Sequence, residues 1–171
     1  ALGLPSVPCF DIRQQCSGFV YGLQLADAHV RAGLARRVLL VGAEVHSAFM
    51  PFREASWARL AGAADTPIPQ DEWDFNTQNR HLEVLFGDGA AAVVVQAFEG
   101  GDRGLIDHLI GADGTDFTRL YIPGAGTRNR PYLDAALLER NEQWPRMDGR
   151  YVFKMATTKM AEVTQQILQR N

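Results

Sequence analysis

The order of apolar segments between Val7 and Gly42 constrains the fold more strongly than any other part of the chain. An apolar segment, Val7–Ile12, precedes a stretch in which apolar residues recur at spacings of three and four, as on one face of a helix. Those residues are Phe19, Leu23, Ala26 and Val30. Gly33 then ends the predicted helix, and Val38–Gly42 has the continuous apolar character of a strand buried on both faces. A strand, a helix and a second strand within about 35 residues predict a βαβ unit, and with it an α/β fold.

Cys16 stands at the first turn of the predicted helix. The unpaired N–H groups and the positive end of the helix dipole favour the thiolate form of a cysteine there, and the thiolate is the nucleophile. A free cysteine is more often a small buried hydrophobic residue, so both interpretations stay open on position alone. Cys9 has no helix dipole behind it, and we expect it in the core. The chain has 4 histidines, and none has a metal-ligand spacing or a recognisable triad partner. The sequence therefore indicates no histidine that would act as a base for Cys16.

The composition excludes several classes of protein. A chain of 171 residues with 46% hydrophobic and 22% charged residues is typical of a soluble globular domain with a real core. Its net charge of -3 gives no field that would attract nucleic acid or an anionic membrane as a primary partner. The 2 cysteines form neither a disulfide framework nor a zinc motif, and no transmembrane or signal segment is recognisable. We therefore expect a cytoplasmic protein without a metal site.

The segment 47–77 interrupts the regular pattern with prolines, a glycine and three large aromatic residues. Long excursions of this kind in compact domains are usually functional lids or mobile insertions. We expect a short helix over 55–64. The aromatic residues Trp57, Trp73 and Phe75 are expected to fasten the segment to the body of the protein.

Regular secondary structure is again predicted after this segment. The glycines of Gly87–Gly89 predict a tight structural turn before a close-packed strand over 90–95. The glycine-rich run 99–104 marks a subdomain boundary. Residues 112–116 lack the ligand spacing of a calcium loop. An apolar stripe over 151–168 predicts a final helix that faces the core.

Three segments taken together resemble ketoacyl-acyl-carrier-protein synthase III of the thiolase superfamily. They are Phe10–Phe19, Val38–Glu44 and Leu85–Ala92, and three further similar stretches are Ile110–Gly114, Pro123–Arg128 and Gly149–Lys154. The resemblance implies a layered αβαβα thiolase-like fold, present here as a partial chain. It implies that residues 1–98 are the later part of the N-terminal half, with an insertion at about 47–77, and that 99–171 begin the C-terminal half.

The resemblance also implies roles for individual residues. Cys16 would be the nucleophile that accepts an acyl group. Arg80 would lie near the adenine and phosphate end of coenzyme A, although a solvated loop arginine is an equal alternative. Phe153 would lie near the floor of the active site, although a buried helix position predicts phenylalanine equally well. Gly87 and Gly89 would permit close packing beside the helix of the nucleophile.

The implied reaction is a decarboxylating Claisen condensation. An acyl group from acyl-coenzyme A or acyl carrier protein would form a thioester on Cys16 and condense with a malonyl carrier, with no cofactor beyond the coenzyme A thioester as substrate. The family's histidine and asparagine are expected beyond Asn171. Family members are dimers, and Val7–Ile12 would be the strand that pairs across the two-fold axis.

Two departures from the family keep alternatives open. Gln14 and Gln15 stand where family members usually have small residues, which affects the shape of the acyl pocket. The long segment 47–77 indicates a specialised relative, so acyl transfer or non-decarboxylating condensation with another acceptor is an alternative reaction. A catalytically incomplete chain that acts only as a structural or interaction module is an alternative of a different class.

Overall fold

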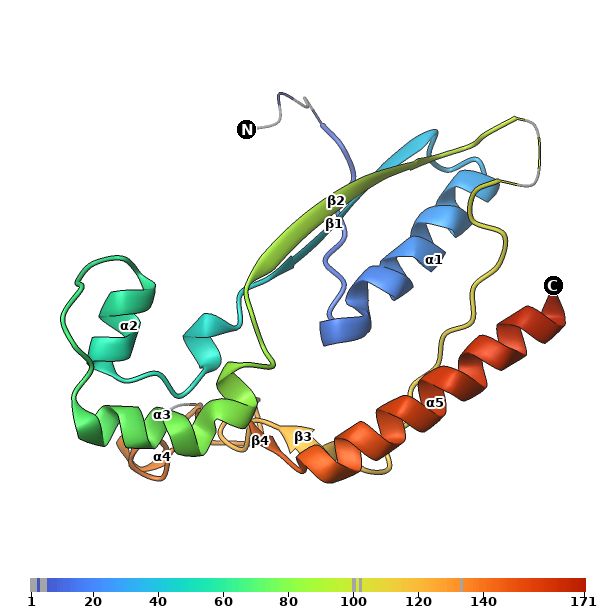
Figure 1. Ribbon diagram of the computed structural model, residues 1–171. Helices are drawn as coiled ribbons and strands as arrows, with labels where there is room; N and C mark the ends of the chain where they lie inside the picture. Colours follow the sequence, from blue (N-terminus) through green and yellow to red (C-terminus); the bar gives the residue numbers. More distant parts are fainter. Residues whose placement is uncertain (1–2, 4–5, 100, 102, 133) are drawn as a thin grey trace. The chain divides into compact units, whose positions relative to one another are not determined.

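The computed structural model describes residues 3, 6–99, 101, 103–132 and 134–171. Its helices are α1 (Gly18–Arg31), α2 (Glu54–Leu60), α3 (Gln70–Glu83), α4 (Ala135–Glu139) and α5 (Gly149–Arg170), with single 3-10 turns at Gln15–Ser17, Ser47–Phe49 and Phe117–Arg119 (Figure 1). Its strands are β1 (Arg37–Glu44), β2 (Gly89–Gln96), β3 (Leu120–Tyr121) and β4 (Arg146–Met147). None of the helices in these ranges is long and apolar enough to cross a membrane.

The chain divides into two compact units. The first holds Ala1–Ala43, Ala90–Gly111 and Asn171, and the second holds Glu44–Gly89 and Ala112–Arg170. The sequence predicted a different division, at about residue 98, between the two halves of a thiolase-like protein. That division stays a prediction. Gly100 and Asp102 of the predicted boundary lie outside the described residues.

The first unit packs α1 against the pair of strands β1 and β2 (Figure 1). Arg37 Nε donates to Gln96 Oε1 at 3.0 Å, so the start of β1 lies beside the end of β2 and the strands run antiparallel. A Cβ atom on Gly22 would stand 2.5 Å from Leu40 Cδ1. Because glycine has no such atom, α1 approaches β1 closely at this point.

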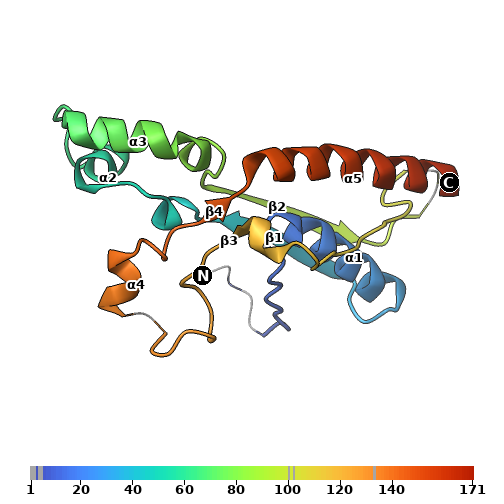
Figure 2. The same cartoon turned by 90° about the horizontal axis from the view of Figure 1, so that it is seen from below.

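The second unit joins α2, α3, α4 and α5 to a small antiparallel ladder. In that ladder Leu120 of β3 lies opposite Met147 of β4. Helices α2 and α3 lie side by side in both views (Figures 1 and 2). The buried apolar side chains among the described residues are few, with Ala26 in the first unit and Met50, Pro51, Leu82 and Leu137 in the second.

Periodicity predicted the main elements correctly. The helix after Cys16 is α1, and Gly33, in the left-handed conformation with φ of 70°, follows its end. The predicted strands are β1 and β2, and the predicted short and final helices are α2 and α5. Residues 86–88 connect α3 to β2 without regular structure, and Gly89 already belongs to β2, so the predicted tight turn at 87–89 is not found there.

Several packing predictions were wrong for this chain. β1 is not buried on both faces, since only alternate residues are half-buried, as expected when a single layer covers a sheet. Cys9 is exposed rather than in the core. No residue of α5 is buried. A Cβ atom added to Gly87 or Gly89 would have no neighbouring atom within 4 Å, so these glycines pack against no helix within the described residues.

The segment Val7–Ile12 forms no strand in the structure. A strand requires a hydrogen-bonded neighbour, and the part of the chain that the structure describes offers none to this segment. The predicted βαβ unit is consequently replaced by α1 and an antiparallel pair. Val7 is 57% exposed and Phe10 is 71% exposed.

Helix α3 lies largely inside the segment that the sequence predicted as irregular. Its polar sequence has no apolar stripe, so periodicity could not reveal it. The signals that could have found it are electrostatic: acidic residues in the first turn, Asp71 and Glu72, and basic residues in the last turn, Arg80 and His81.

The aromatic residues of 47–77 behave in three ways. Phe75 of α3 packs on Trp144 at a ring separation of 5.5 Å. This contact attaches α3 to the chain after α4 in the same unit, as predicted for the aromatic residues of this segment. Trp57 stacks on Phe52 inside the segment itself. Trp73 is exposed.

Candidate functional site

Cys16 occupies the 3-10 turn that leads directly into α1, and its side chain is exposed. Ser17 closes the turn, because both its N–H and its Oγ donate to the carbonyl oxygen of Gln14, at 3.2 and 3.0 Å. The helix that follows is 14 residues long. Its aligned peptide dipoles direct their positive end toward the cysteine. The structure thus places the predicted nucleophile, accessible, at a helix N-terminus.

The backbone immediately before Cys16 is strained. Gln15 has a φ of 43°, in the left-handed region that non-glycine residues rarely adopt. Such a conformation costs about 1–3 kcal/mol and persists only where the surroundings enforce it. The family resemblance predicts a small residue at this position, where the chain has Gln15. The positive φ explains that preference, because glycine adopts this conformation without a steric penalty.

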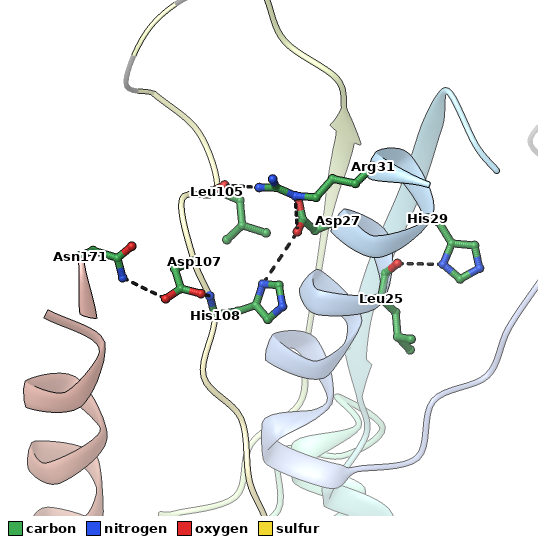
Figure 3. Close-up of polar contacts among 8 residues, drawn as sticks. All are labelled: Leu25, Asp27, His29, Arg31, Leu105, Asp107, His108 and Asn171. Atoms are coloured by element: carbon green, nitrogen blue, oxygen red, sulfur yellow. Dashed lines mark hydrogen bonds and ion pairs between the residues drawn. The ribbon is translucent and has the colours of Figure 1, made fainter. Parts of the chain in front are cut away.

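Two long-range contacts hold α1 within the first unit. The hydroxyl of Tyr21 donates to the carbonyl oxygen of Gly111 at 2.9 Å. Arg31 Nη2 donates to the carbonyl oxygen of Leu105 at 3.3 Å (Figure 3). The segment 105–111 is thereby fixed along the helix that begins beside Cys16.

A polar cluster reinforces this attachment (Figure 3). Arg31 Nε contacts both carboxylate oxygens of Asp27 at 2.7 Å. His108 Nδ1 lies 3.8 Å from Asp27 Oδ2. The spacing of Asp27 and Arg31, four residues apart on a helix, could have been read from the sequence. The approach of His108 could not, because it depends on the fold.

Arg80 and Phe153 belong to the second unit, whereas Cys16 belongs to the first. Arg80 lies in the last turn of α3, and its guanidinium makes no hydrogen bond or ion pair with any described residue. Phe153 lies in α5 and is 72% exposed, so the alternative explanation, a buried helix position, does not hold. The binding roles of both residues stay predictions.

Asp88 ties the turn before β2 to the residues that follow β1. Its carboxylate accepts hydrogen bonds from the N–H groups of His46 and Ser47, at 2.7 and 2.8 Å, and from Ser47 Oγ at 2.6 Å. The Ser47 hydroxyl first, and then the two N–H groups, hold the pKa of Asp88 below its ordinary value against the effect of burial. A carboxylate so fully engaged is suited to a structural role rather than to proton abstraction.

Glu72 plays a similar part between α2 and α3. Its carboxylate accepts from the N–H of Ser56 at 2.6 Å and from the N–H of Ala55 at 3.3 Å. Burial raises the pKa of Glu72, but the hydrogen bonds from Ser56 and Ala55 outweigh burial and the pKa is lowered overall. Sequence patterns did not predict these roles of Asp88 and Glu72. Each carboxylate accepts hydrogen bonds from residues distant in the sequence, which only the fold brings near.

Comparison with known proteins gives a consistent result. A family model described as 3-oxoacyl-[acyl-carrier-protein (ACP)] synthase III matches residues 10–65 and 73–114. Those ranges include Cys16 and Arg80 but not Phe153. Residues 66–72, inside the predicted insertion, fall between the two matched ranges.

Curated proteins resemble the chain along nearly its whole length. Beta-ketoacyl-[acyl-carrier-protein] synthase III of Fusobacterium nucleatum is 34% identical over 169 residues, which are 99% of this chain and 43% of that protein. Beta-ketoacyl-[acyl-carrier-protein] synthase III 3 of Streptomyces coelicolor is 35% identical over 170 residues, with the same coverage of 99% and 43%. The chain therefore spans less than half the length of these relatives.

Solved structures agree. The 3-oxoacyl-(acyl carrier protein) synthase III, FabH, of Pseudomonas aeruginosa PAO1 superposes with a TM-score of 0.61 at 30% identity, covering 90% of this chain and 38% of that one. A second 3-oxoacyl-(acyl-carrier-protein) synthase III superposes with a TM-score of 0.66 at 24% identity, covering 90% and 40%, and supports the fold alone.

Proposed function

The chain belongs to the 3-oxoacyl-[acyl-carrier-protein] synthase III family, and on that premise we propose that the whole protein is an acyltransferase whose nucleophile is Cys16. Its fold is the α/β thiolase-like fold of that family, present in part. The observation that carries the proposal is the exposed thiol of Cys16 at the start of α1, inside a matched range.

In the first half of the proposed reaction, the Cys16 thiolate attacks the carbonyl carbon of an acyl thioester. A bond forms between the Cys16 sulfur and the acyl carbon, and the bond from that carbon to coenzyme A sulfur breaks. Coenzyme A leaves as a thiol with the proton that Cys16 gave up. The backbone N–H of Cys16, at the helix start, helps to hold the negatively charged oxygen of the tetrahedral intermediate.

In the second half, the acyl-enzyme meets a malonyl group on acyl carrier protein. Loss of carbon dioxide leaves a carbanion, which bonds to the acyl carbon, and the bond from that carbon to Cys16 breaks and returns the thiolate. The histidine and asparagine that the family resemblance implies complete this step in the proposal.

Three finer assignments belong to the same proposal. Arg80 contacts the adenine and phosphate end of coenzyme A, which its unpaired guanidinium among the described residues supports. Phe153 lies at the floor of the active site. The protein is a cytoplasmic homodimer that needs no cofactor beyond its thioester substrate, and the unpaired Val7–Ile12 segment supports pairing across the dimer axis.

Labelling with radioactive acyl-coenzyme A tests the role of Cys16. We expect the full-length protein to become labelled and the Cys16→Ala variant to remain unlabelled. Cys9→Ala is the matched control, since Cys9 is also an exposed free cysteine but has no helix behind it, and it should retain full labelling. Equal labelling of the wild type and Cys16→Ala would overturn the proposal.

The alternative acceptor rests on the predicted insertion at about 47–77, of which the family model leaves residues 66–72 unmatched. Product analysis with malonyl carrier as the sole acceptor separates the two reactions. A chain-lengthened product supports decarboxylating condensation. An acyl-enzyme that forms but yields no such product supports another acceptor, and failure of Cys16 to react with a mild alkylating agent supports a purely structural module.

A further inference from the structure

The N-terminal half of α1 packs closely on β1. A Cβ atom on Gly22 of the helix would stand 2.5 Å from Leu40 Cδ1 of the strand. A Cβ atom on Gly42 of the strand would stand 3.1 Å from Phe19 Cδ2 of the helix. These apolar contacts hold the helix near the strand, but the hydrophobic effect has no direction. They leave α1 able to turn about the line along which it touches β1.

Tyr21 makes a directional contact on another face of the same helix. At about 3.6 residues per turn, Tyr21 lies about 160° around the helix axis from Phe19. Its hydroxyl donates to the carbonyl oxygen of Gly111 at 2.9 Å. A hydrogen bond requires both a short distance and a favourable angle, so this bond restricts the rotation that the apolar contacts leave open.

The position of Tyr21 along α1 places this contact close to the thiol of Cys16. At about 1.5 Å per residue, Tyr21 lies about 8 Å along the helix axis from Cys16. Arg31 Nη2 ties the same helix to the same segment, through the carbonyl oxygen of Leu105 at 3.3 Å (Figure 3). That second contact lies about 22 Å along the axis from Cys16. The two contacts therefore differ chiefly in their distance from the nucleophile.

We infer that Tyr21 is a positioning residue for Cys16. The inference rests on the proposed function, in which the Cys16 thiolate attacks an acyl thioester. Tyr21 acts through α1, because its hydrogen bond to Gly111 holds the first turn of the helix in one orientation. The sulfur and the backbone N–H of Cys16 are thereby kept in line with the carbonyl group that they attack and stabilise. Without this bond the thiol is intact but misaligned.

Tyr21→Phe in the full-length protein tests the inference, because it removes only the hydroxyl. Single-turnover labelling with radioactive acetyl-, butyryl- and octanoyl-coenzyme A gives a rate constant of acylation and a half-saturating concentration for each thioester. With the thioester that labels the wild type fastest, we expect Tyr21→Phe to lower the rate constant roughly tenfold, since small misplacements of reacting atoms slow a reaction. The half-saturating concentration should stay unchanged, because Tyr21 is not assigned to substrate binding.

Alkylation of Cys16 by iodoacetamide separates misalignment from loss of the thiol. Mass spectrometry of the peptide that carries Cys16 measures its rate. We expect Tyr21→Phe to be alkylated as fast as the wild type, because this small reagent needs no alignment with a bound substrate. A parallel loss of alkylation and acylation would overturn the inference, since it would show general disruption around Cys16.

Arg31→Gln is the matched control, because it breaks a contact between the same helix and the same segment, far from Cys16. It should be acylated at the wild-type rate even where urea unfolding shows it to be as destabilised as Tyr21→Phe. Equal acylation rates in the wild type and Tyr21→Phe would overturn the inference alone, and so would an equal slowing in Arg31→Gln. A wild-type protein that none of the thioesters labels would overturn the proposed function, and this inference with it.

Discussion

At the scale of single residues, Cys16 directly follows a backbone position in a rarely adopted conformation. Gln15 holds a left-handed conformation with φ of 43°, while Gln14 does not, with φ of -138°. Backbone strain of this kind is concentrated at functional sites, where the surrounding structure compensates for it. The strain sets the direction in which the chain enters α1 and so where the thiol lies.

Replacement of Gln15 by glycine should relieve this strain. We expect Gln15→Gly to raise the free energy of unfolding by about 1 kcal/mol, because glycine adopts positive φ without a steric penalty. Urea unfolding followed by circular dichroism measures the change. Gln14→Gly is the control and should instead lower stability, since it adds freedom to the unfolded chain without relieving strain. Equal effects of the two substitutions would show that φ at Gln15 is not the cause.

Asp88 gives stability a defined dependence on pH. Its pKa is lowered in the folded protein chiefly by the Ser47 hydroxyl, so its contribution is present above the ordinary pKa of 3.8 and is lost as pH falls through the lower folded value. We expect Asp88→Asn to be less stable than the wild type at pH 7, and the difference to shrink below pH 3.8. Unfolding curves across that range measure it. A stability difference that stays constant with pH would exclude the ionised carboxylate of Asp88 as its cause. Ser47→Ala, which removes the hydroxyl that donates to this carboxylate, should also lower stability at pH 7.

At the scale of elements, sequence patterns predicted those with strong periodicity and missed those organised by charge. α1, β1, β2 and α5 follow from the spacing of apolar residues. α3 has no such spacing, and its signals are the charges at its two ends. The contacts of His108 with Asp27 and of Ser47 with Asp88 join residues far apart in the chain, so local pattern could not predict them. The position of Cys16 at a helix start was predictable because the signal is local, and its role as nucleophile stays a prediction.

The contact between α1 and β1 can be tested at Gly22. A Cβ atom there would stand 2.5 Å from Leu40 Cδ1. A single methyl group meets only the mobile end of a leucine, and alanine favours helix, so Gly22→Ala should change the free energy of unfolding by less than about 1 kcal/mol. Gly22→Val should lower it by about 2 kcal/mol, because its branched side chain overfills the contact. Thermal unfolding of both variants measures this, and a valine variant as stable as the alanine variant would contradict close packing at Gly22.

At the scale of the whole molecule, several large apolar side chains lie exposed on the strands and on the last helix. Leu39 and Val41 of β1, Val94 of β2 and Met160 of α5 are all exposed. Large apolar areas on a protein surface mark interaction sites, and here the chain spans 43% of the length of a curated relative. The apolar strand face and the unpaired Val7–Ile12 segment are what a sheet presents when its neighbouring layers and strands are elsewhere in a larger protein.

The proposed dimer makes a specific demand on the Val7–Ile12 segment. If this segment pairs with its copy across a two-fold axis, one end of the segment lies opposite the other end of the partner's segment. Val7 is 57% exposed and free to take that position. A lysine there would place an unpaired charge against the apolar segment of the partner, which destabilises the pairing. We expect Val7→Lys in the full-length protein to shift the sedimentation coefficient toward that of a monomer as concentration falls. Val84→Lys, at an apolar position outside the segment that is 77% exposed, should sediment as the wild type does. A Val7→Lys protein that remains dimeric at every concentration would place the dimer contact elsewhere on the surface.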